Sequence, residues 1–367
     1  MTVKVFEPLT AAEDTFSSCF LGLLPDVTNY EYTQLWAGTG TFSLSVPLTD
    51  RAARLLQPFR VLCVNDDWLM IAKVDFSESS GQITVSGTDL CGILDHFLTL
   101  WADPQTPGAE GYDVVEDTIY NCVKHYLDNN IISPADSNRQ MLHFSLAAAG
   151  GVGSTQTHYM ARLQQLSVVV ADLCGVDELG YTVTGDFSAN KYVLKLRQGR
   201  DRSAGAAGNK IILSAARGNA VEVEYENSTE SLINAIYATG AGVTELVTRT
   251  GTPPQGIYRR EGAVSVQADT VSDIPRYALN TMRDNVQNVC MTVQPRLALW
   301  ESGEIRLGDI VTAIDDRTGT RITARITAVR RTESGSGRSV YLTVGTPTQK
   351  LLNRIITDIY NGIAKRR

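Results

Sequence analysis

The stretch RVLCVNDDWLMIAKVDFSESSGQITVSG, residues 60–87, predicts the fold class most directly. It contains three apolar runs, separated by NDD at 65–67 and by SSG at 79–81. Asn, Asp, Ser and Gly at such breaks favour tight turns, and apolar runs joined by tight turns are typical of antiparallel strands. We therefore expect a three-stranded antiparallel meander.

One more strand and two short helices surround this meander. Residues 41–46 alternate between apolar and polar side chains, which is the period of a half-buried strand. A short helix follows and ends at Pro58, because proline breaks helical hydrogen bonding. Thr88 is the expected cap of a helix over residues 89–98, whose apolar residues share one face. We predict that residues 1–100 form a small antiparallel β-barrel domain.

The periodicity of the chain changes after residues 102–112, which are rich in proline and glycine and mark a boundary. Asp113 and Glu116 match a capping box at the start of a helix. The elements expected here are a helix from about 113 to 129, a helix over about 157–174, and strands at 181–184 and 192–196. Residues 198–209 have the composition of a flexible linker. We therefore predict an α+β insertion domain over residues 101–209.

Strand patterns return after the insertion. In AVEVEYEN, residues 220–227, apolar and acidic residues alternate, which suits a strand with one buried and one solvated face. The apolar positions are Val221, Val223 and Tyr225, and the acidic positions are Glu222, Glu224 and Glu226. Further strand patterns occupy residues 210–215, 232–240, 245–249, 262–269, 291–300, 309–316, 320–330 and 338–345. We predict a second small antiparallel β-barrel domain over residues 210–346.

One helix is expected inside this second domain, from Asp273 to about Asn288, with Pro275 in its first turn, where proline is tolerated. The helix and the strand after it, residues 270–304, are candidates for packing against the insertion. No tandem repeat of 20 to 50 residues is visible. The outline of the chain is nevertheless symmetric, since two β domains flank the insertion.

The last segment, residues 347–367, predicts a C-terminal amphipathic helix. Thr346 and Gln349 match a capping box, and Pro347 occupies the first helical position. Seven apolar residues on one side form the candidate interface: Leu351, Leu352, Ile355, Ile356, Ile359, Tyr360 and Ile363. Such a stripe is covered either by its own domain or by another subunit or partner. We expect a subunit or partner contact, because the preceding barrel should already have a filled core.

Composition excludes several classes of function. The 40 acidic residues outnumber the 33 basic ones, and the net charge is -7, so the basic footprint of a nucleic-acid-binding protein is missing. The first residues lack the apolar core of a secretory signal, and no apolar run reaches the ~18 residues of a membrane span. We expect a protein that folds in a cytoplasm without export through a signal peptide.

The cysteines and histidines do not form a recognisable metal or redox motif. The six cysteines are Cys19, Cys63, Cys91, Cys122, Cys174 and Cys290, and no two have CxxC spacing. We interpret them as small, reduced core residues. The four histidines are His96, His125, His143 and His158, and none belongs to an HExxH motif. They are expected at helix surfaces and core edges, and we predict no metal and no cofactor.

No motif for catalysis stands out in the local sequence. GGVGST at 150–155 lacks the lysine of a phosphate loop and predicts a flexible connector. The pairs Asp66-Asp67 and Asp315-Asp316 lie in expected turns, where aspartate is favoured, and adjacent residues cannot face each other across a sugar. We predict no catalytic residues and no enzymatic activity, while a site assembled from distant residues stays open at this level.

Several segments resemble one family. They are TQLWAGTGTFSLSVPL (33–48), WLMIAKVDFSESSGQITVSGTDLCGIL (68–94), NSTESLINAIYATGAG (227–242), GIYRREGAVSVQAD (256–269) and LGDIVTAID (307–315). In order and spacing they resemble the siphophage tail-tip hub proteins. These are related to the N-terminal part of tail-associated lysins and to the central baseplate hub of contractile phages.

This resemblance implies a structural virion protein at the tail tip, assembled in the host cytoplasm. Such hubs are homotrimers in which two β-barrels per subunit form a pseudo-sixfold ring that joins the tail tube and distal tail protein to the tip. The implied partners are the distal tail protein, the tape measure protein and a separate tip or fibre protein. The tape measure protein and then DNA pass through the channel, and the DNA is not bound specifically. An acidic or neutral lining would let DNA slide, and Glu222, Glu224 and Glu226 are candidates for it.

Two alternatives remain at the level of the sequence. One is a cell-wall or polysaccharide hydrolase of the tail tip, which would need facing carboxylates, one of them with a raised pKa. The other is a host-binding adhesin, which would need clustered exposed aromatic residues. The four tryptophans are dispersed, and most are expected in cores: Trp36, Trp68, Trp101 and Trp300.

Overall fold

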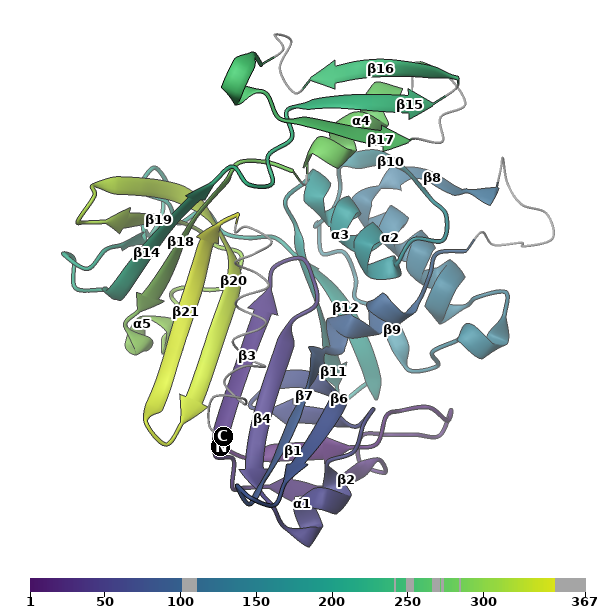
Figure 1. The fold of residues 1–367 in the computed structure, drawn as a ribbon. Coiled ribbons are helices and arrows are strands. Elements are labelled where there is room, and N and C mark those ends of the chain that lie inside the picture. The colour runs from purple at the N-terminus through teal and green to yellow at the C-terminus, as the bar shows by residue number, and fades with distance from the viewer. Residues whose placement is uncertain are drawn as a thin grey trace.

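The computed structural model describes residues 1–100, 111–240, 242–248, 254–265, 271, 274–283 and 285–346. These residues form a mainly β, α+β fold with antiparallel sheets and short helices, in agreement with the predicted class. Figure 1 shows two groups of long strands side by side, β18 to β21 and β3 to β7, with the layer of α2 and α3 next to them. A small separate sheet, β15 to β17, lies at the top of this view.

The group that includes β3 to β7, called module 1, contains the predicted meander. Its elements are β1 Val3–Phe6, β2 Phe20–Leu24, β3 Asn29–Leu35, β4 Thr41–Pro47, α1 Asp50–Leu55, β5 Val61–Val64, β6 Asp67–Ser77, β7 Gln82–Asp89 and the 3₁₀ helix η1 Leu90–His96. β5, β6 and β7 pair antiparallel in sequence order, which confirms the meander. Thr49 caps α1, and Asp89 rather than Thr88 caps η1, because the Asp89 carboxylate accepts from the Cys91 N–H.

The insertion alternates strands and helices. Its elements are β8 Asp113–Thr118, α2 Ile119–Leu127, the π-helical turn η3 Asp128–Ile132, η4 Ser137–Arg139, β9 Phe144–Leu146, β10 Gln156–Ala161, α3 Leu166–Val176, β11 Gly180–Asp186 and β12 Lys191–Arg197. The two predicted strands, β11 and β12, are confirmed as an antiparallel pair. The second half of the helix predicted over 157–174 is confirmed as α3.

Both helix predictions in the insertion are wrong at their starts. Residues 113–118 form β8 and residues 156–161 form β10, and the two strands pair antiparallel along their whole length. Apolar residues at helical spacing do occur there, but pairing between the two segments satisfies their backbone groups instead. The helix that was predicted to begin at Asp113 begins at Ile119, where Thr118 is the cap.

Two boundary predictions in this region are also wrong. The helix α2 does not stop at Asn129 and Asn130 but continues into η3, where the Asn130 side chain accepts from the Leu100 N–H and donates to the Tyr126 carbonyl. Residues 198–209 are not a loose linker. Their backbone bonds twice to Ile310, and Arg200 forms an ion pair with the second β region, so the segment is held in place.

The group that includes β18 to β21, called module 2, contains most of the strands predicted after the insertion. Its elements are β13 Ile212–Leu213, β14 Ala220–Ser228, β18 Asn288–Pro295, α5 Leu297–Glu301, β19 Ile310–Asp315, β20 Thr320–Ser334 and β21 Gly337–Gly345. The strand expected over 291–300 is wrong after Pro295, because residues 297–301 form the helix α5. Proline lacks the N–H that would continue the ladder, so the strand ends there.

A small lobe interrupts module 2 between β14 and β18. It contains β15 Ala235–Gly240, β16 Val243–Thr248, η5 Gly256–Tyr258, β17 Glu261–Ser265 and α4 Ile274–Arg283. Pro275 lies in the first turn of α4, as predicted. One face of the lobe's sheet packs on α4 in a core that contains only lobe residues, among them Ile236, Ala278 and Met282.

The alternation predicted for β14 is only partly correct. Val223 is buried, but Val221 is 62% exposed and Tyr225 is 38% exposed. The register of β14 against β18 shifts at Val221, so that residue bulges out of the ladder. β14 is also the last strand of its sheet, which leaves both of its faces partly solvated. The burial of Val221 and Tyr225 was therefore predicted wrongly.

Modules 1 and 2 share one continuous sheet. Its strands follow the order β14-β18-β21-β20-β3-β4-β7-β6-β5-β1-β2, with β19 and β13 attached at β20. The joint is the antiparallel pair of β20 and β3. Among the described residues these pairings form an open path, and no closed barrel is present. Each module nevertheless encloses a core of its own, one around Leu44 and Val85 and the other around Met291 and Leu342.

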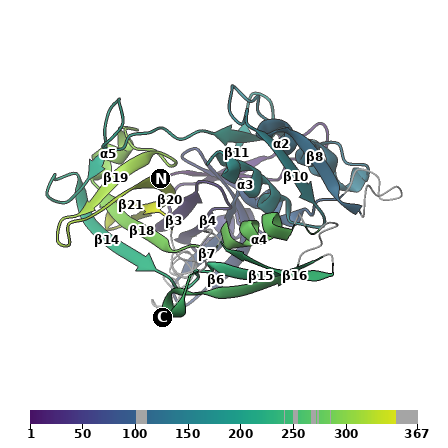
Figure 2. The same cartoon turned by 90° about the horizontal axis from the view of Figure 1, so that it is seen from above.

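The two modules repeat one topology. In module 1 the order along the chain is β3, β4, α1, β5, β6, β7, and in module 2 it is β14, β18, α5, β19, β20, β21. The pairing is also the same, because β3-β4-β7-β6-β5 corresponds to β14-β18-β21-β20-β19. Figure 2, the view from above, shows module 2 and the insertion on opposite sides of β3 and β4. The symmetry that the sequence suggested in outline is thus present strand by strand.

Candidate functional site

The predicted interface on the terminal helix lies outside the described residues. This applies to all seven of its positions: Leu351, Leu352, Ile355, Ile356, Ile359, Tyr360 and Ile363. What the described residues do show is how the three regions of the chain are joined, which polar groups are engaged, and which strand edges remain open.

Trp36, at the end of β3, lies where module 1, module 2 and the insertion meet. Its backbone N–H donates to the Thr327 carbonyl of β20 at 2.9 Å, and its carbonyl accepts from the Tyr181 N–H of β11 at 3.0 Å. Its indole N–H donates to the Glu178 carbonyl at 3.0 Å. A residue of the first module is thus fixed through its backbone to module 2 and through its backbone and side chain to the insertion.

Two guanidinium groups lie over the Trp36 ring. The Arg197 carbon Cζ is 5.0 Å and the Arg325 Cζ is 5.6 Å from the ring centroid, within the range of cation–π attraction. Arg325 also pairs with Glu178 at 2.6 Å and donates to the Gly308 carbonyl at 2.7 Å. These contacts tie the start of β19, the insertion and β3 into one junction.

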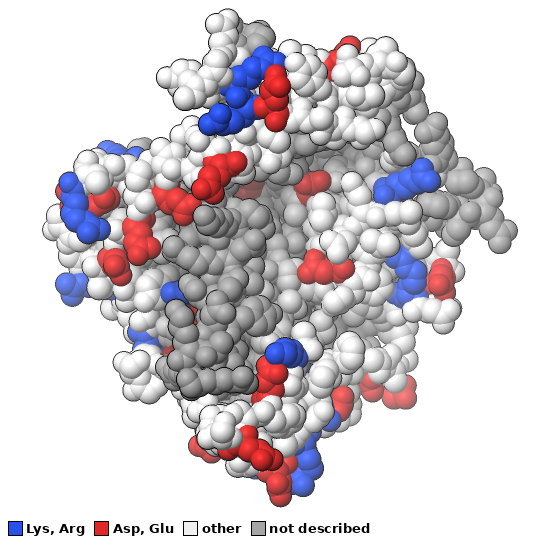
Figure 3. Space-filling view, in the orientation of Figure 1, with Lys and Arg blue, Asp and Glu red and all other residues white. Residues whose placement is uncertain are grey.

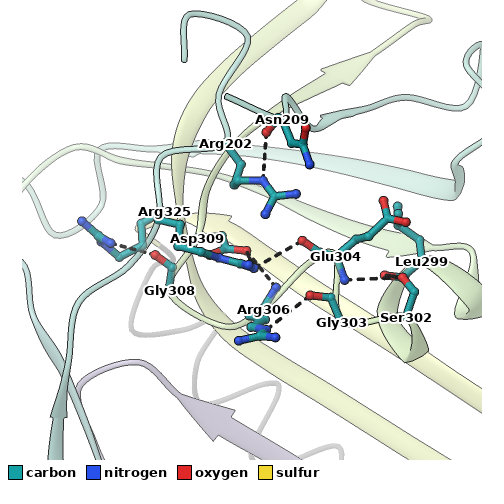
Figure 4. Close-up of polar contacts among 11 residues, drawn as sticks. Arg202, Asn209, Leu299, Ser302, Gly303, Glu304, Arg306, Gly308, Asp309 and Arg325 are labelled. Atoms are coloured by element: carbon teal, nitrogen blue, oxygen red, sulfur yellow. Dashed lines mark hydrogen bonds and ion pairs between the residues drawn. The ribbon is translucent and has the colours of Figure 1, made fainter. Parts of the chain in front are cut away.

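The Leu307-Gly308-Asp309 segment has a clear structural role in this junction (Figure 4). Gly308 has a φ of +91°, and a side chain there would overlap the Trp36 ring. Asp309 is buried and accepts two bonds from Arg200, Nε to Oδ1 at 2.9 Å and Nη2 to Oδ2 at 2.6 Å. This pairing with Asp309 raises the pKa of Arg200. Gly308 and Asp309, in one of the segments quoted for the family resemblance, are therefore junction residues.

A second polar network crosses the joint between β3 and β20. Arg331 donates to Asp67 at 2.7 Å, and its Cζ lies 5.0 Å from the centroid of the Tyr32 ring. The Tyr32 hydroxyl donates to Asp89 at 3.0 Å, and burial raises the pKa of the Asp89 carboxyl to about 6. Arg331 thus links β20 to β6, and it does so through Asp67, which was expected only to shape a turn.

The other paired carboxylates also have structural partners. Asp316 accepts from the Ser214 hydroxyl and the Ala216 N–H, both at 2.8 Å, and these bonds hold the pKa of its carboxyl below the usual value. Asp315 accepts from Thr318 at 2.8 Å within the turn, as predicted.

A hollow of about 140 Å³ between α5 and the β20–β21 hairpin is small compared with the ~300 Å³ of typical ligand sites.

The histidine prediction is only partly correct, because His96 and His125 lie on helices as expected, whereas His158 is exposed on the strand β10. His96 is exposed on η1, and His125 of α2 lies 2.6 Å from Asp113. His143 is buried, with its two ring nitrogens 2.8 Å from the Asn190 carbonyl and 2.7 Å from the Ala11 carbonyl.

All six cysteines are buried and unpaired with one another, which confirms their interpretation as core residues. Burial raises the pKa of the Cys174 thiol to about 12. Within the described ranges no three His, Cys, Asp or Glu side chains are grouped as metal ligands would be.

Trp36 and Trp68 are buried and Trp300 is half-buried, while Trp101 is outside the described residues. No helix in that part of the chain is long and apolar enough to cross a membrane.

Besides β2 at one end, the continuous sheet has two further open edges among the described residues. The outer edge of β14 and the second half of β6, residues 73–77, have no strand beside them in the part of the chain that the structure describes. Each carries an exposed aromatic residue, Tyr225 on β14 and Phe76 on β6. Figure 3 shows acidic side chains gathered where β14 lies in Figure 1, and Glu222 and Glu224 of that strand are exposed. Sequence periodicity could not reveal these edges, because openness depends on pairing.

Comparisons with known proteins place this architecture. Residues 18–261, more than half of the chain, match the family described as Siphovirus ReqiPepy6 Gp37-like protein. No curated protein matches the sequence.

Three solved structures share the fold over nearly the whole chain. The 43 kDa tail protein of prophage MuSo2 from Shewanella oneidensis is 14% identical, with 95% of this chain and 99% of that chain covered and a TM-score of 0.54. The prophage tail protein gp18 from Listeria monocytogenes is 12% identical over 98% and 99% of the two chains, with a TM-score of 0.52. A tail protein from Neisseria meningitidis is 15% identical over 94% and 96%, with a TM-score of 0.54.

Proposed function

The chain belongs to the Siphovirus ReqiPepy6 Gp37-like protein family, and on that premise we propose that it is the trimeric hub at the tip of a phage tail. It is a structural phage tail protein of the virion, and the hub is the specific position that we assign to it. In this role it joins the tail tube and the distal tail protein to the tip and surrounds the channel for the tape measure protein and DNA.

The repeated topology of modules 1 and 2 is the observation that carries this proposal. A chain with two equivalent modules presents six of them in a trimer, and six modules can meet a sixfold tube while the trimer meets a threefold tip. The rigid junction at Trp36 supports the same role, because two modules fixed to each other keep a constant angle around a ring.

This role assigns each region of the chain to a part of the assembly. We assign the ring to the two β modules, residues 1–100 and 210–346, as the barrel-like domains, with residues 101–209 as the insertion on the outside. The acidic strand β14 favours a channel that does not hold DNA. The terminal helix, residues 347–367, is assigned to a subunit or a separate tip or fibre protein through its apolar stripe. Assembly in the host cytoplasm is part of the same proposal.

Neither enzymatic activity nor a cofactor is part of this function. The paired aspartates support that view, because Asp67, Asp315 and Asp316 are engaged in structural bonds. A zymogram on host cell walls tests the hydrolase alternative, and a cleared band from purified protein would contradict the proposed role.

Light scattering after size-exclusion chromatography tests the hub directly. We expect a particle of about 120 kDa, three times the 40.0 kDa of one chain, and a threefold ring in negative-stain images. A protein that remains monomeric at high concentration and shows no ring would overturn the proposal.

The terminal helix provides a separate prediction. Ile355→Asp combined with Ile359→Asp places two charges on its apolar side, and each buried side chain of this kind contributes roughly 1.5 to 3 kcal/mol. We expect assembly to weaken while the melting temperature of the monomer stays unchanged. Unfolding of the double variant, or an unaffected trimer, would assign the helix to packing within its own domain.

A further inference from the structure

We propose that the second half of β6 pairs, in antiparallel register, with β14 of a second copy of this chain, so that Phe76 lies opposite Tyr225 of its neighbour. This inference rests on the proposed ring, since it names the strands that would join its subunits. It is argued from the internal repeat of the chain, in which the equivalent strands already pair with each other.

The proposed contact between β6 and β14 of two copies repeats the pairing of β20 with β3 that joins the modules inside one chain. β20 is long, and its first half pairs with β19, whereas residues 328–334 extend past β19 and pair with residues 29–35 of β3. In that joint Arg331 lies opposite Tyr32, and Thr332 lies opposite Glu31. The equivalent strand β6 has the same design, because its first half pairs with β5 and residues 73–77 extend beyond it.

The strand bulges align the two modules residue by residue. β6 skips one residue against β7 at Ala72, and β20 skips one residue against β21 at Thr327. Counting from these bulges aligns residues 73–77 with residues 328–332. Phe76 therefore corresponds to Arg331, and Ser77 corresponds to Thr332.

The ladders align the receiving strands in the same way. In module 1, Glu31 pairs with Ser43 on the next strand, Ser43 pairs with Ser86, and Ser86 pairs with Lys73. In module 2, the ladder from Glu224 runs in the same way through Thr292 and Thr343 to Ala328. Glu31 thus corresponds to Glu224, and by the next position Tyr32 corresponds to Tyr225. The register inside the chain then places Phe76 opposite Tyr225, and Ser77 opposite Glu224, in a second copy.

Both edges are available for this contact among the described residues. Phe76 is 53% exposed and Tyr225 is 38% exposed, whereas Tyr32, the equivalent of Tyr225, is buried in the joint inside the chain. Exposed aromatic residues on open strands are unfavourable in water and promote strand pairing. Pairing them replaces the Arg331–Tyr32 stack by an aromatic pair of the kind that stabilises neighbouring strands.

The charges on the other face determine how the edges fit. Asp75 would lie opposite Glu226, which is repulsive by itself. Lys73 forms an ion pair with Asp75 at 2.6 Å and is one pleat away on the same face, so it supplies the positive charge for both carboxylates. Each copy has one edge of each kind, so the contact is head-to-tail, the type from which a closed ring rather than a twofold dimer is built.

Paired cysteines test the register. Ser77→Cys with Glu224→Cys, in one chain, should form disulfides between copies after mild oxidation, because directly opposite residues of antiparallel strands are within disulfide reach. The matched positive control is Thr332→Cys with Glu31→Cys, the equivalent pair, which should link within one chain. The register control is Ser77→Cys with Ser228→Cys, four residues away, which should not link.

Non-reducing gels and light scattering separate the possible outcomes. Covalent multimers for the first variant only, with the native particle mass unchanged, would support the proposal. A trimer that assembles but gives no covalent multimer, while the control inside the chain links, would overturn this interface and leave the hub intact. A monomer with no link between copies would overturn both the interface and the hub.

A second test does not depend on disulfides. Phe76→Asp should weaken association by about tenfold or more, because it removes the aromatic pair and places a carboxylate opposite the Tyr225 ring, while the melting temperature of the monomer is retained. Tyr258→Asp is the matched control, since Tyr258 is 79% exposed and lies in η5 of the lobe, away from β6 and β14. Equal association of the two variants would contradict the proposed contact.

Discussion

The contact between Trp36 and Gly308 leaves no room for a side chain at the junction. We predict that Gly308→Ala lowers the free energy of unfolding by roughly 2 to 4 kcal/mol, because the added methyl group overlaps the ring and the backbone keeps a positive φ. Gly319→Ala is the control, since Gly319 has a φ of +70° but nothing within 4 Å of an added Cβ. Urea unfolding measures the free energy of unfolding of both variants. If both lose the same amount, the overlap with the Trp36 ring does not cause the destabilisation.

Asp89 should make stability depend on pH. Burial raises the pKa of its carboxyl from 3.8 to about 6, so the folded protein holds this proton more tightly than the unfolded chain. The resulting stabilisation is full below about pH 4 and is lost as the pH rises through about 6. Asp89→Asn cannot titrate, so between pH 4 and 7 its stability should rise relative to wild type by roughly 1 to 3 kcal/mol. Urea titrations across this range check the trend, and a constant difference would contradict it.

Local sequence was sufficient at some of these residues and insufficient at others. The buried, reduced cysteines follow from apolar surroundings and missing motifs, and they were predicted. The ion pair of Arg200 with Asp309 joins residues that are far apart in sequence, so no local pattern contains it. The same is true of Asp67, whose place in a turn was visible but whose bond to Arg331 was not.

The small lobe is the element whose removal should matter least to the rest of the fold. Ser228 and Asn288 lie opposite each other at its base, so a two-residue Asn-Gly turn could join β14 to β18 directly. We predict that replacing residues 229–287 by Asn-Gly leaves modules 1 and 2 folded, because the core of the lobe contains only lobe residues. Circular dichroism and thermal melting measure this, and aggregation of the shortened chain would show that the lobe is needed for folding.

At the level of elements, the predictions succeeded where apolar runs were bounded by turns and failed where pairing overrode periodicity. β5, β6 and β7 were predicted because residues 65–67 and 79–81 break them. The sequence pattern of β8 and β10 predicts helix, because helical and strand patterns coincide over six residues and only the pairing of the two segments decides between them. The predicted interface of the terminal helix, residues 351–363, lies outside the described residues and stays a prediction.

The whole molecule carries an excess of acidic charge, and this should keep it from binding DNA. With a net charge of -7 and an acidic β14 assigned to the channel, the protein repels phosphates rather than attracting them. We expect no shift of duplex DNA in a gel at about 50 mM salt, where electrostatic binding is strong. A basic DNA-binding protein serves as the positive control, and a clear shift by the wild-type chain would contradict passage without binding.

The molecule-wide topology was the part that sequence reasoning reached least. The symmetric outline was predicted, but the continuous sheet was not, because the pair of β3 and β20 joins opposite ends of the chain. Closed barrels were expected, since turn-rich β domains commonly close. Among the described residues the sheet instead passes from one module into the other.

The pairing of β3 with β20 also sets the order of events during synthesis. β3 leaves the ribosome well before its partner, residues 328–334, which is made only after the insertion and most of module 2. At roughly 5 to 20 residues per second, the nascent chain therefore keeps this edge unpaired for tens of seconds. On a polysome, a neighbouring chain could supply its own β20 and produce a swapped dimer. Translation speed and chaperone binding during that interval should therefore affect how much of the product folds as a single chain with its own β3 and β20 paired.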